Sequence, residues 1–103
     1  MKIRSIELKS VTAALLRTEI LYSVASARAC GEELVELICP SVDSKCENNV
    51  IKVMKELKKQ GRIKVYSAAR DLHDQSKEAE YLLNKYPEIK LLAEKGTSII
   101  AML

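Results

Sequence analysis

The sequence predicts an α/β fold: one domain over residues 1–103, with a β-α-β-α-β core, an extra helix and a C-terminal strand. The expected architecture is a two-layer or three-layer sandwich around a mostly parallel four-stranded sheet. Three observations predict it. Short apolar runs alternate with segments of helical periodicity, the connections between them are short, and a β-branched apolar run closes the chain. A chain of this length has room for one domain.

The first strand is expected over residues 3–8, where apolar and polar side chains alternate from Ile6 onward. Ser10 follows as the expected helix N-cap. The first helix is then predicted over residues 11–30, with Gly31 supplying the residue that ends it.

The first helix carries few charges. Only Arg17, Glu19 and Arg28 are charged, and apolar positions such as Leu16 and Ile20 cover more than one stripe. This pattern indicates a helix buried along two faces, the second meeting another part of the chain or another subunit. A homodimer through residues 11–30 is therefore one possible assembly.

A second strand is predicted over residues 34–39, as an apolar run that is mostly buried. After a short loop, Ser44 and Glu47 fit a capping box, which places Ser44 at the N-cap of a second helix. That helix ends at Gly61. The third strand is expected over residues 62–66.

Residues 70–95 are interpreted as a helical insertion before the last strand. A polar helix is predicted from Asp74, a natural N-cap, to Tyr86, where Pro87 stops it. A shorter helical segment follows, and residues 97–103 form the terminal strand.

Composition narrows the classes of function. The formal net charge is +3, which permits an anionic partner without requiring one. The three cysteines match no zinc spacing and are expected as core or near-core thiols, so no metal or cofactor is predicted. No apolar run is long enough to span a membrane and no signal peptide is evident, so the expected location is cytoplasmic with no membrane partner.

Positive residues are densest on the second helix and directly after it, at Arg62 and Lys64. A basic helix face of this kind could follow the phosphates of RNA or DNA, although a solvated helix face gives the same pattern. The candidate nucleic-acid-binding residues are Lys9, Lys45, Lys52, Lys55, Lys59 and Arg62.

His73 is the one histidine, with Asp74 beside it. A histidine and a carboxylate can serve general acid–base chemistry, as in a hydrolase or nuclease. Asp74 as a helix cap explains the same residues without catalysis. His73 and Asp74 are therefore the catalytic candidates, and no complete catalytic motif is present.

The order of elements and the terminal strand resemble the Smr (small MutS-related) domain, a family of nucleic-acid-handling proteins with a β-α-β-α-β-β sandwich, some of which cleave nucleic acid. Its first signature, Leu-Asp-Leu-His-Gly, would fall on Ile6-Glu7-Leu8-Lys9-Ser10, where lysine replaces the histidine. Its second, His-Gly-Lys-Gly, would fall on Cys39-Pro40-Ser41-Val42, where no residue matches. The ending Gly96–Leu103 is similar to the family's last strand.

Because the signature histidines are absent, the resemblance implies a non-catalytic Smr-like domain that binds nucleic acid. A structural or regulatory homo-oligomer associating through the first helix is the alternative from another class. A hydrolase or nuclease using His73 is the third.

Overall fold

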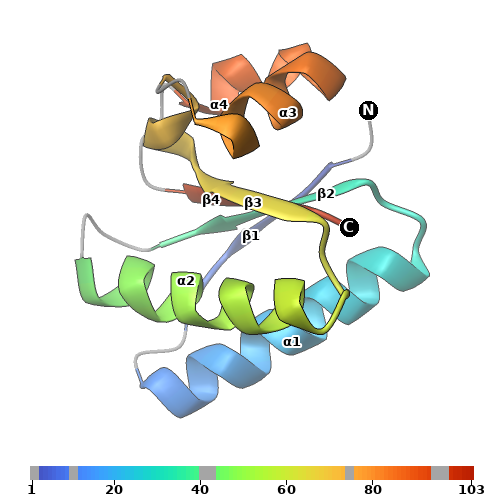
Figure 1. The fold of residues 1–103 in the computed structure, drawn as a ribbon. Coiled ribbons are helices and arrows are strands. Elements are labelled where there is room, and N and C mark those ends of the chain that lie inside the picture. Colours follow the sequence, from blue (N-terminus) through green and yellow to red (C-terminus); the bar gives the residue numbers. More distant parts are fainter. Residues whose placement is uncertain (1–2, 10–11, 40–43, 74–75, 94–97) are drawn as a thin grey trace.

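A four-stranded sheet forms the centre of the molecule in the computed structural model, which describes residues 3–9, 12–39, 44–73, 76–93 and 98–103 (Figure 1). Its spatial order is β1-β2-β4-β3. The strands are β1 (Ile3–Glu7), β2 (Leu34–Ile38), β3 (Val65–Ala68) and β4 (Ser98–Met102).

The expectation of a mostly parallel sheet is wrong, because β4 runs antiparallel to both of its neighbours. Only β1 and β2 pair in parallel, with Ile3 opposite Leu34, whereas β4 pairs antiparallel with β2 and with β3. The connection from β2 to β3 passes over one strand position and leaves a gap between them. β4 fills that gap and hydrogen-bonds to strands on both sides.

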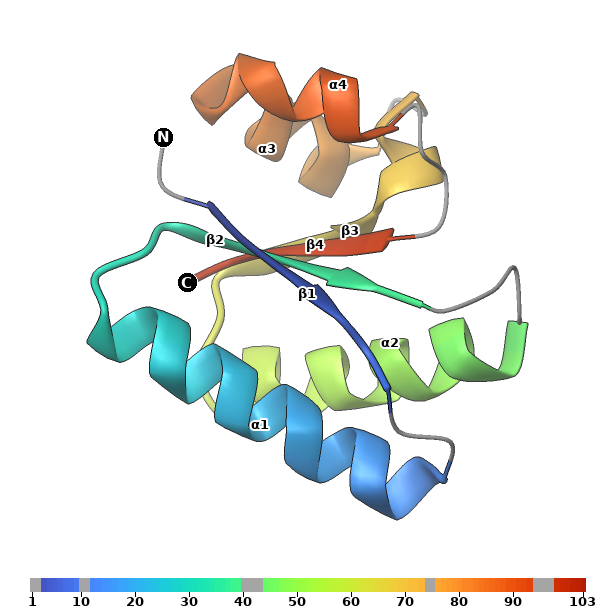
Figure 2. The same ribbon diagram turned by 180° about the vertical axis from the view of Figure 1, so that it is seen from behind.

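Helices cover both faces of the sheet, so the sandwich has three layers (Figure 2). The helices α1 (Ala13–Ala29) and α2 (Ser44–Lys59) lie on one face. The opposite face carries the segment between β3 and β4, which comprises η1 (Ala69–His73), α3 (Lys77–Lys85), η2 (Pro87–Ile89) and α4 (Lys90–Ala93).

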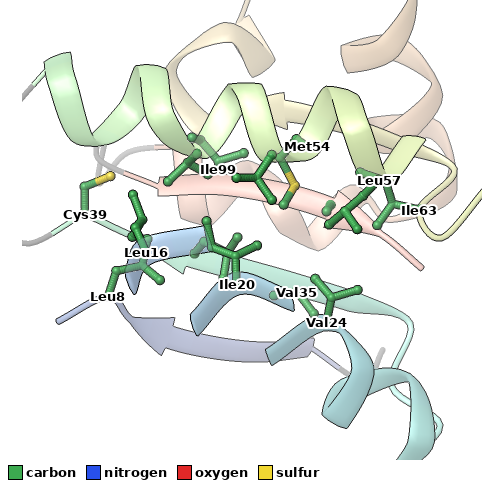
Figure 3. Packing of buried hydrophobic residues seen from close by; sticks show 14 of the residues in the cluster. Leu8, Leu16, Ile20, Val24, Val35, Cys39, Met54, Leu57, Ile63 and Ile99 are labelled. Carbon is green, nitrogen blue, oxygen red and sulfur yellow. The ribbon is translucent and has the colours of Figure 1, made fainter. Parts of the chain in front are cut away.

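Each face of the sheet has its own core, because successive strand residues point to opposite faces. In β4, Ile99 and Ala101 belong to the core beneath α1 and α2, while Ile100 and Met102 belong to the core beneath α3. Figure 3 shows Met54 and Leu57 of α2 pointing toward the sheet. β4 is buried along its whole length, which explains why it reads as a continuous apolar run.

Gly31 and Gly61 end the first two helices as the sequence predicts. Both have a left-handed backbone, with φ of 74° and 75°. In each case the next residue's amide reaches back to a carbonyl in the last turn: Glu32 to Ala27 at 3.0 Å and Arg62 to Leu57 at 2.9 Å. Both helices therefore end in a Schellman motif, which favours glycine because glycine adopts a positive φ without steric strain.

Several predicted element starts shift by a few residues. Thr12, rather than Ser10, caps α1 by accepting a hydrogen bond from the Leu15 amide at 3.3 Å. Ser10 itself lies outside the described residues. α2 already includes Ser44 as its first residue, so its cap position also falls outside them.

The largest shift in a strand concerns β3, which begins at Val65 and extends to Ala68 instead of spanning residues 62–66. Ile63 is nevertheless buried, ahead of the strand. The cap of α3 is Ser76, whose hydroxyl accepts from the Ala79 amide at 3.2 Å. The predicted cap, Asp74, lies outside the described residues.

Candidate functional site

The outward face of α2 carries a row of lysines. The exposed positions of this face follow one another at steps of three or four residues, and four of the five are lysines: Lys45, Asn48, Lys52, Lys55 and Lys59. The opposite side is buried through Val50, Val53, Met54 and Leu57. We call Lys45, Lys52, Lys55 and Lys59 the lysine stripe; all four are exposed. From first to last it extends about 21 Å at 1.5 Å per residue.

The two remaining predicted binding residues, Arg62 and Lys9, lie outside α2. Arg62 is exposed just beyond the C-terminal end of α2. Lys9 follows β1, which runs parallel to β2. Its backbone amide donates to the Glu19 carboxylate of α1 at 3.2 and 3.3 Å, a contact with α1 rather than with α2. The structure therefore gathers the four stripe lysines on one face and sets Lys9 apart.

Glu56 is the acidic residue beside the stripe, and α1 supplies its counter-charge. Arg17 Nη2 donates to Glu56 Oε1 at 2.5 Å and Arg17 Nε donates to Oε2 at 3.3 Å, a two-point contact between the helices. The hydrogen bond from Arg17 holds the pKa of Glu56 below its usual range. Glu56 thus neutralises Arg17 and leaves the positive charge of the stripe in place.

No ion pair engages Lys52, Lys55 or Lys59 among the residues that the structure describes, where the charged contacts join Arg4 to Glu32 and Arg17 to Glu56. Unpaired ammonium groups in a row keep a positive potential that an anionic partner would meet. A solvated face would have the same geometry, so charge alone does not define the partner.

The outward face of α1 carries exposed apolar residues instead of lysines. Leu15 is 58% exposed and Tyr22 is 75% exposed. Thr18, Ala25 and Ala29 share that face at helical spacing and are exposed as well. We call these five residues the α1 stripe. Two apolar residues of the same helix, Leu16 and Ile20, point into the core instead, as Figure 3 shows. Within one subunit only the inner face of α1 is buried, so burial of its second face against another subunit stays a prediction.

A groove of about 490 Å³ separates the C-terminal parts of α1 and α2. Its walls are mainly apolar, from Leu21, Val24, Ala25 and Leu57, and two cations, Arg28 and Arg62, lie at its rim. The Arg28 guanidinium donates to the backbone carbonyl of Arg62 at 3.5 Å. The groove therefore lies at the C-terminal end of α2, where Lys59 is the last residue of the lysine stripe.

Of the two catalytic candidates, only the backbone of His73 lies within the described residues, in the segment that follows β3. His73 is the last residue of η1, but its side chain is outside the described part of the structure, as is all of Asp74. A cavity of about 360 Å³ near η1 mixes both signs of charge, with Lys58, Asp71 and Glu78 in its lining. Burial, and secondarily the charge of Glu78, raises the pKa of Tyr66 in the same lining. Across the described residues no three acidic, cysteine or histidine side chains converge as metal ligands would.

The sequence interpretation did not identify Glu36 as a buried residue. Glu36 of β2 is 1% exposed, and its Oε1 accepts a hydrogen bond from Ser5 Oγ at 2.7 Å, while Oε2 has no partner among the described residues. Ser98 Oγ lies on the same face of the sheet and is also buried, with no partner in the described part of the chain. The signal was present in the sequence, since Glu36 is the one charged residue in the apolar run of β2.

No protein-family model, no curated protein and no solved structure matches this chain. A search of the described residues for a helix long and apolar enough to cross a membrane found none.

Proposed function

We propose that this chain is a non-catalytic, Smr-like domain that binds nucleic acid along its phosphate backbone through the lysine stripe. The observation that carries the proposal is the single exposed face that holds Lys45, Lys52, Lys55 and Lys59. Lysine ammonium groups bind phosphates as point charges, and such contacts supply affinity without reading sequence.

The length of the stripe favours a duplex partner. Four lysines along one helix present a row about 21 Å long, and a duplex presents a regular row of phosphates over the same distance. Single-strand binding uses stacking of bases on aromatic rings, and the lysine stripe contains none.

The order of elements supports the family part of the proposal. The chain has β-α-β-α-β followed by a terminal strand, with the helical segment 69–93 before that strand. Lys9 and Cys39 occupy positions where the Smr signatures carry histidines. Binding without cleavage is the consequence.

Fluorescence anisotropy with labelled duplex RNA and duplex DNA of one sequence tests the proposal. We expect wild-type binding at about 50 mM salt that weakens as salt rises. The triple variant K52Q/K55Q/K59Q should lose at least about tenfold in affinity, and its log–log salt slope should fall by about 2 to 3.

The matched control is K77Q/K85Q/K90Q, which removes the same charge from the exposed surface of the opposite helical layer. It should retain most of the wild-type affinity. Absence of wild-type binding at low salt, or equal losses in the two triple variants, would contradict the proposal.

A second candidate function is self-association through the α1 stripe, favoured by the exposure of Leu15 and Tyr22. Apolar side chains at helical spacing are the usual anchors of a helix-to-helix interface. Sedimentation velocity over a range of concentrations tests it. Dimerisation that disappears in Leu15→Glu/Tyr22→Glu would support this role, and a monomer at the highest concentration would exclude it.

A further inference from the structure

Two of the three cysteines meet at the junction between β2 and α2. Cys39 follows the last residue of β2, and Cys46 is the third residue of α2, seven positions later. Their sulfur atoms lie 2.8 Å apart. Cys39 is 6% exposed and Cys46 is partly exposed, so a reagent in solution has access through Cys46. Figure 3 shows Cys39 at the end of β2 nearest the start of α2.

We propose that Cys39 and Cys46 form a redox-active dithiol that exchanges with a low-molecular-weight disulfide of the glutathione class. The Cys46 thiolate attacks one sulfur of the disulfide, forming a mixed disulfide and releasing one thiolate. The Cys39 thiolate then attacks the Cys46 sulfur, closing an intramolecular disulfide and releasing the second thiolate. The protein loses two electrons, the small disulfide gains them, and the two cysteine protons end on the released thiols.

The geometry favours ring closure over accumulation of the mixed disulfide. The sulfurs are already in contact, so closing the bond requires little further ordering of the chain. The enclosed segment is short, and the attack of Cys39 is intramolecular with a high effective concentration.

Cys30 provides an internal contrast. It is exposed at the C-terminal cap of α1, at the opposite end of that helix from the Cys39–Cys46 junction. No second sulfur contacts it among the described residues. Cys30 is therefore expected to stop at the mixed disulfide, whereas the Cys39–Cys46 pair proceeds to closure.

Intact-mass spectrometry after alkylation tests this proposal. The Cys30→Ser variant is incubated with glutathione disulfide, quenched with acid and alkylated under denaturing conditions. We expect the number of alkylated thiols to fall from two to none, with no glutathione adduct and a mass loss of two hydrogen atoms. Dithiothreitol should restore both thiols. In the wild type, tryptic mapping should join residues 46–52 to 29–45 through Cys39.

Two further variants separate closure from simple accessibility. Cys30→Ser/Cys39→Ser and Cys30→Ser/Cys46→Ser should each accumulate at most a glutathione adduct. Retention of two alkylatable thiols in Cys30→Ser, or a stable adduct on Cys46 beside a free Cys39, would overturn the proposal. The measurement counts thiols only, so it stands or falls independently of nucleic-acid binding.

Discussion

The outward faces of α1 and α2 contrast within one helical layer. Both helices pack their apolar residues on the same face of the sheet, and both expose positions at the same helical spacing. Those positions hold leucine, threonine, tyrosine and two alanines in α1 but four lysines and one asparagine in α2. The core therefore determines only the inner side of each helix. The outer sides are not constrained by the core, so their residue types can differ, as they do here.

The largest expected effect is the difference in unfolding free energy between a substitution on the inner side of α1 and one on its outer side. Ile20→Ala should lower the free energy of unfolding by about 3 kcal/mol, because it opens a cavity at a fully buried position. Tyr22→Ala should change it by less than about 0.5 kcal/mol. Urea denaturation measures both. An equally large loss for Tyr22→Ala would mean that the α1 stripe is packed against a partner in solution.

The next largest effect is expected at Glu36, whose carboxyl group is buried, unlike the exposed charged side chains of α2. Glu36→Gln should raise the free energy of unfolding by about 1 kcal/mol, because Oε2 is buried without a partner among the described residues. Glu33→Gln, at an exposed neighbouring position, is the control and should be nearly neutral. If Glu36→Gln is destabilising instead, the buried carboxylate has a role that the apolar surroundings do not explain.

A pair of single substitutions tests whether position on α2 matters. Lys55→Gln removes a stripe lysine, while Lys58→Gln removes an exposed lysine that lies on a different face, beside the cavity lined by Asp71. Lys55→Gln should weaken duplex binding several-fold and lower the salt slope by about 1. Lys58→Gln should have the smaller effect in the same anisotropy titration. Equal effects would indicate that total charge, not the stripe, governs binding.

The smallest expected effect is the pH dependence of stability that comes from the Arg17–Glu56 ion pair between α1 and α2. Because Arg17 holds the pKa of Glu56 below its usual range, this pair stabilises the fold at neutral pH. That contribution should fade as pH falls through the lowered pKa of Glu56, where the carboxylate becomes protonated. Urea denaturation at a series of acidic pH values should show this loss in wild type and a weaker one in Arg17→Gln. Identical pH profiles would argue that the exposed pair adds nothing.

Much of the fold could be predicted because periodicity and helix-ending glycines are local signals. The runs around Leu34–Ile38 and Ser98–Met102 form strands, and Gly31 and Gly61 end helices as expected. The direction of β4 could not be predicted, because it depends on which gap the β2–β3 connection leaves open. The choice of Thr12 over Ser10 as the cap likewise depends on where the chain leaves the sheet.

The candidate site could likewise be predicted only in part from the sequence. The spacing of Lys45, Lys52, Lys55 and Lys59 could be interpreted from sequence, since helical neighbours follow a fixed step. The contact between Arg17 and Glu56 and the meeting of Cys39 with Cys46 could not. Both depend on how separate elements pack, and packing is not a local property.

The central place of β4 has a consequence for the order in which the molecule can assemble. During synthesis, β3 leaves the ribosome well before β4, yet within the described sheet it pairs with β4 alone. Until residues 98–102 emerge, β3 therefore has no strand to join, and the two cores cannot both close. We expect a nascent chain ending before β4 to be sensitive to protease, with protection arriving late and all at once. Long-range pairing of this kind also slows refolding.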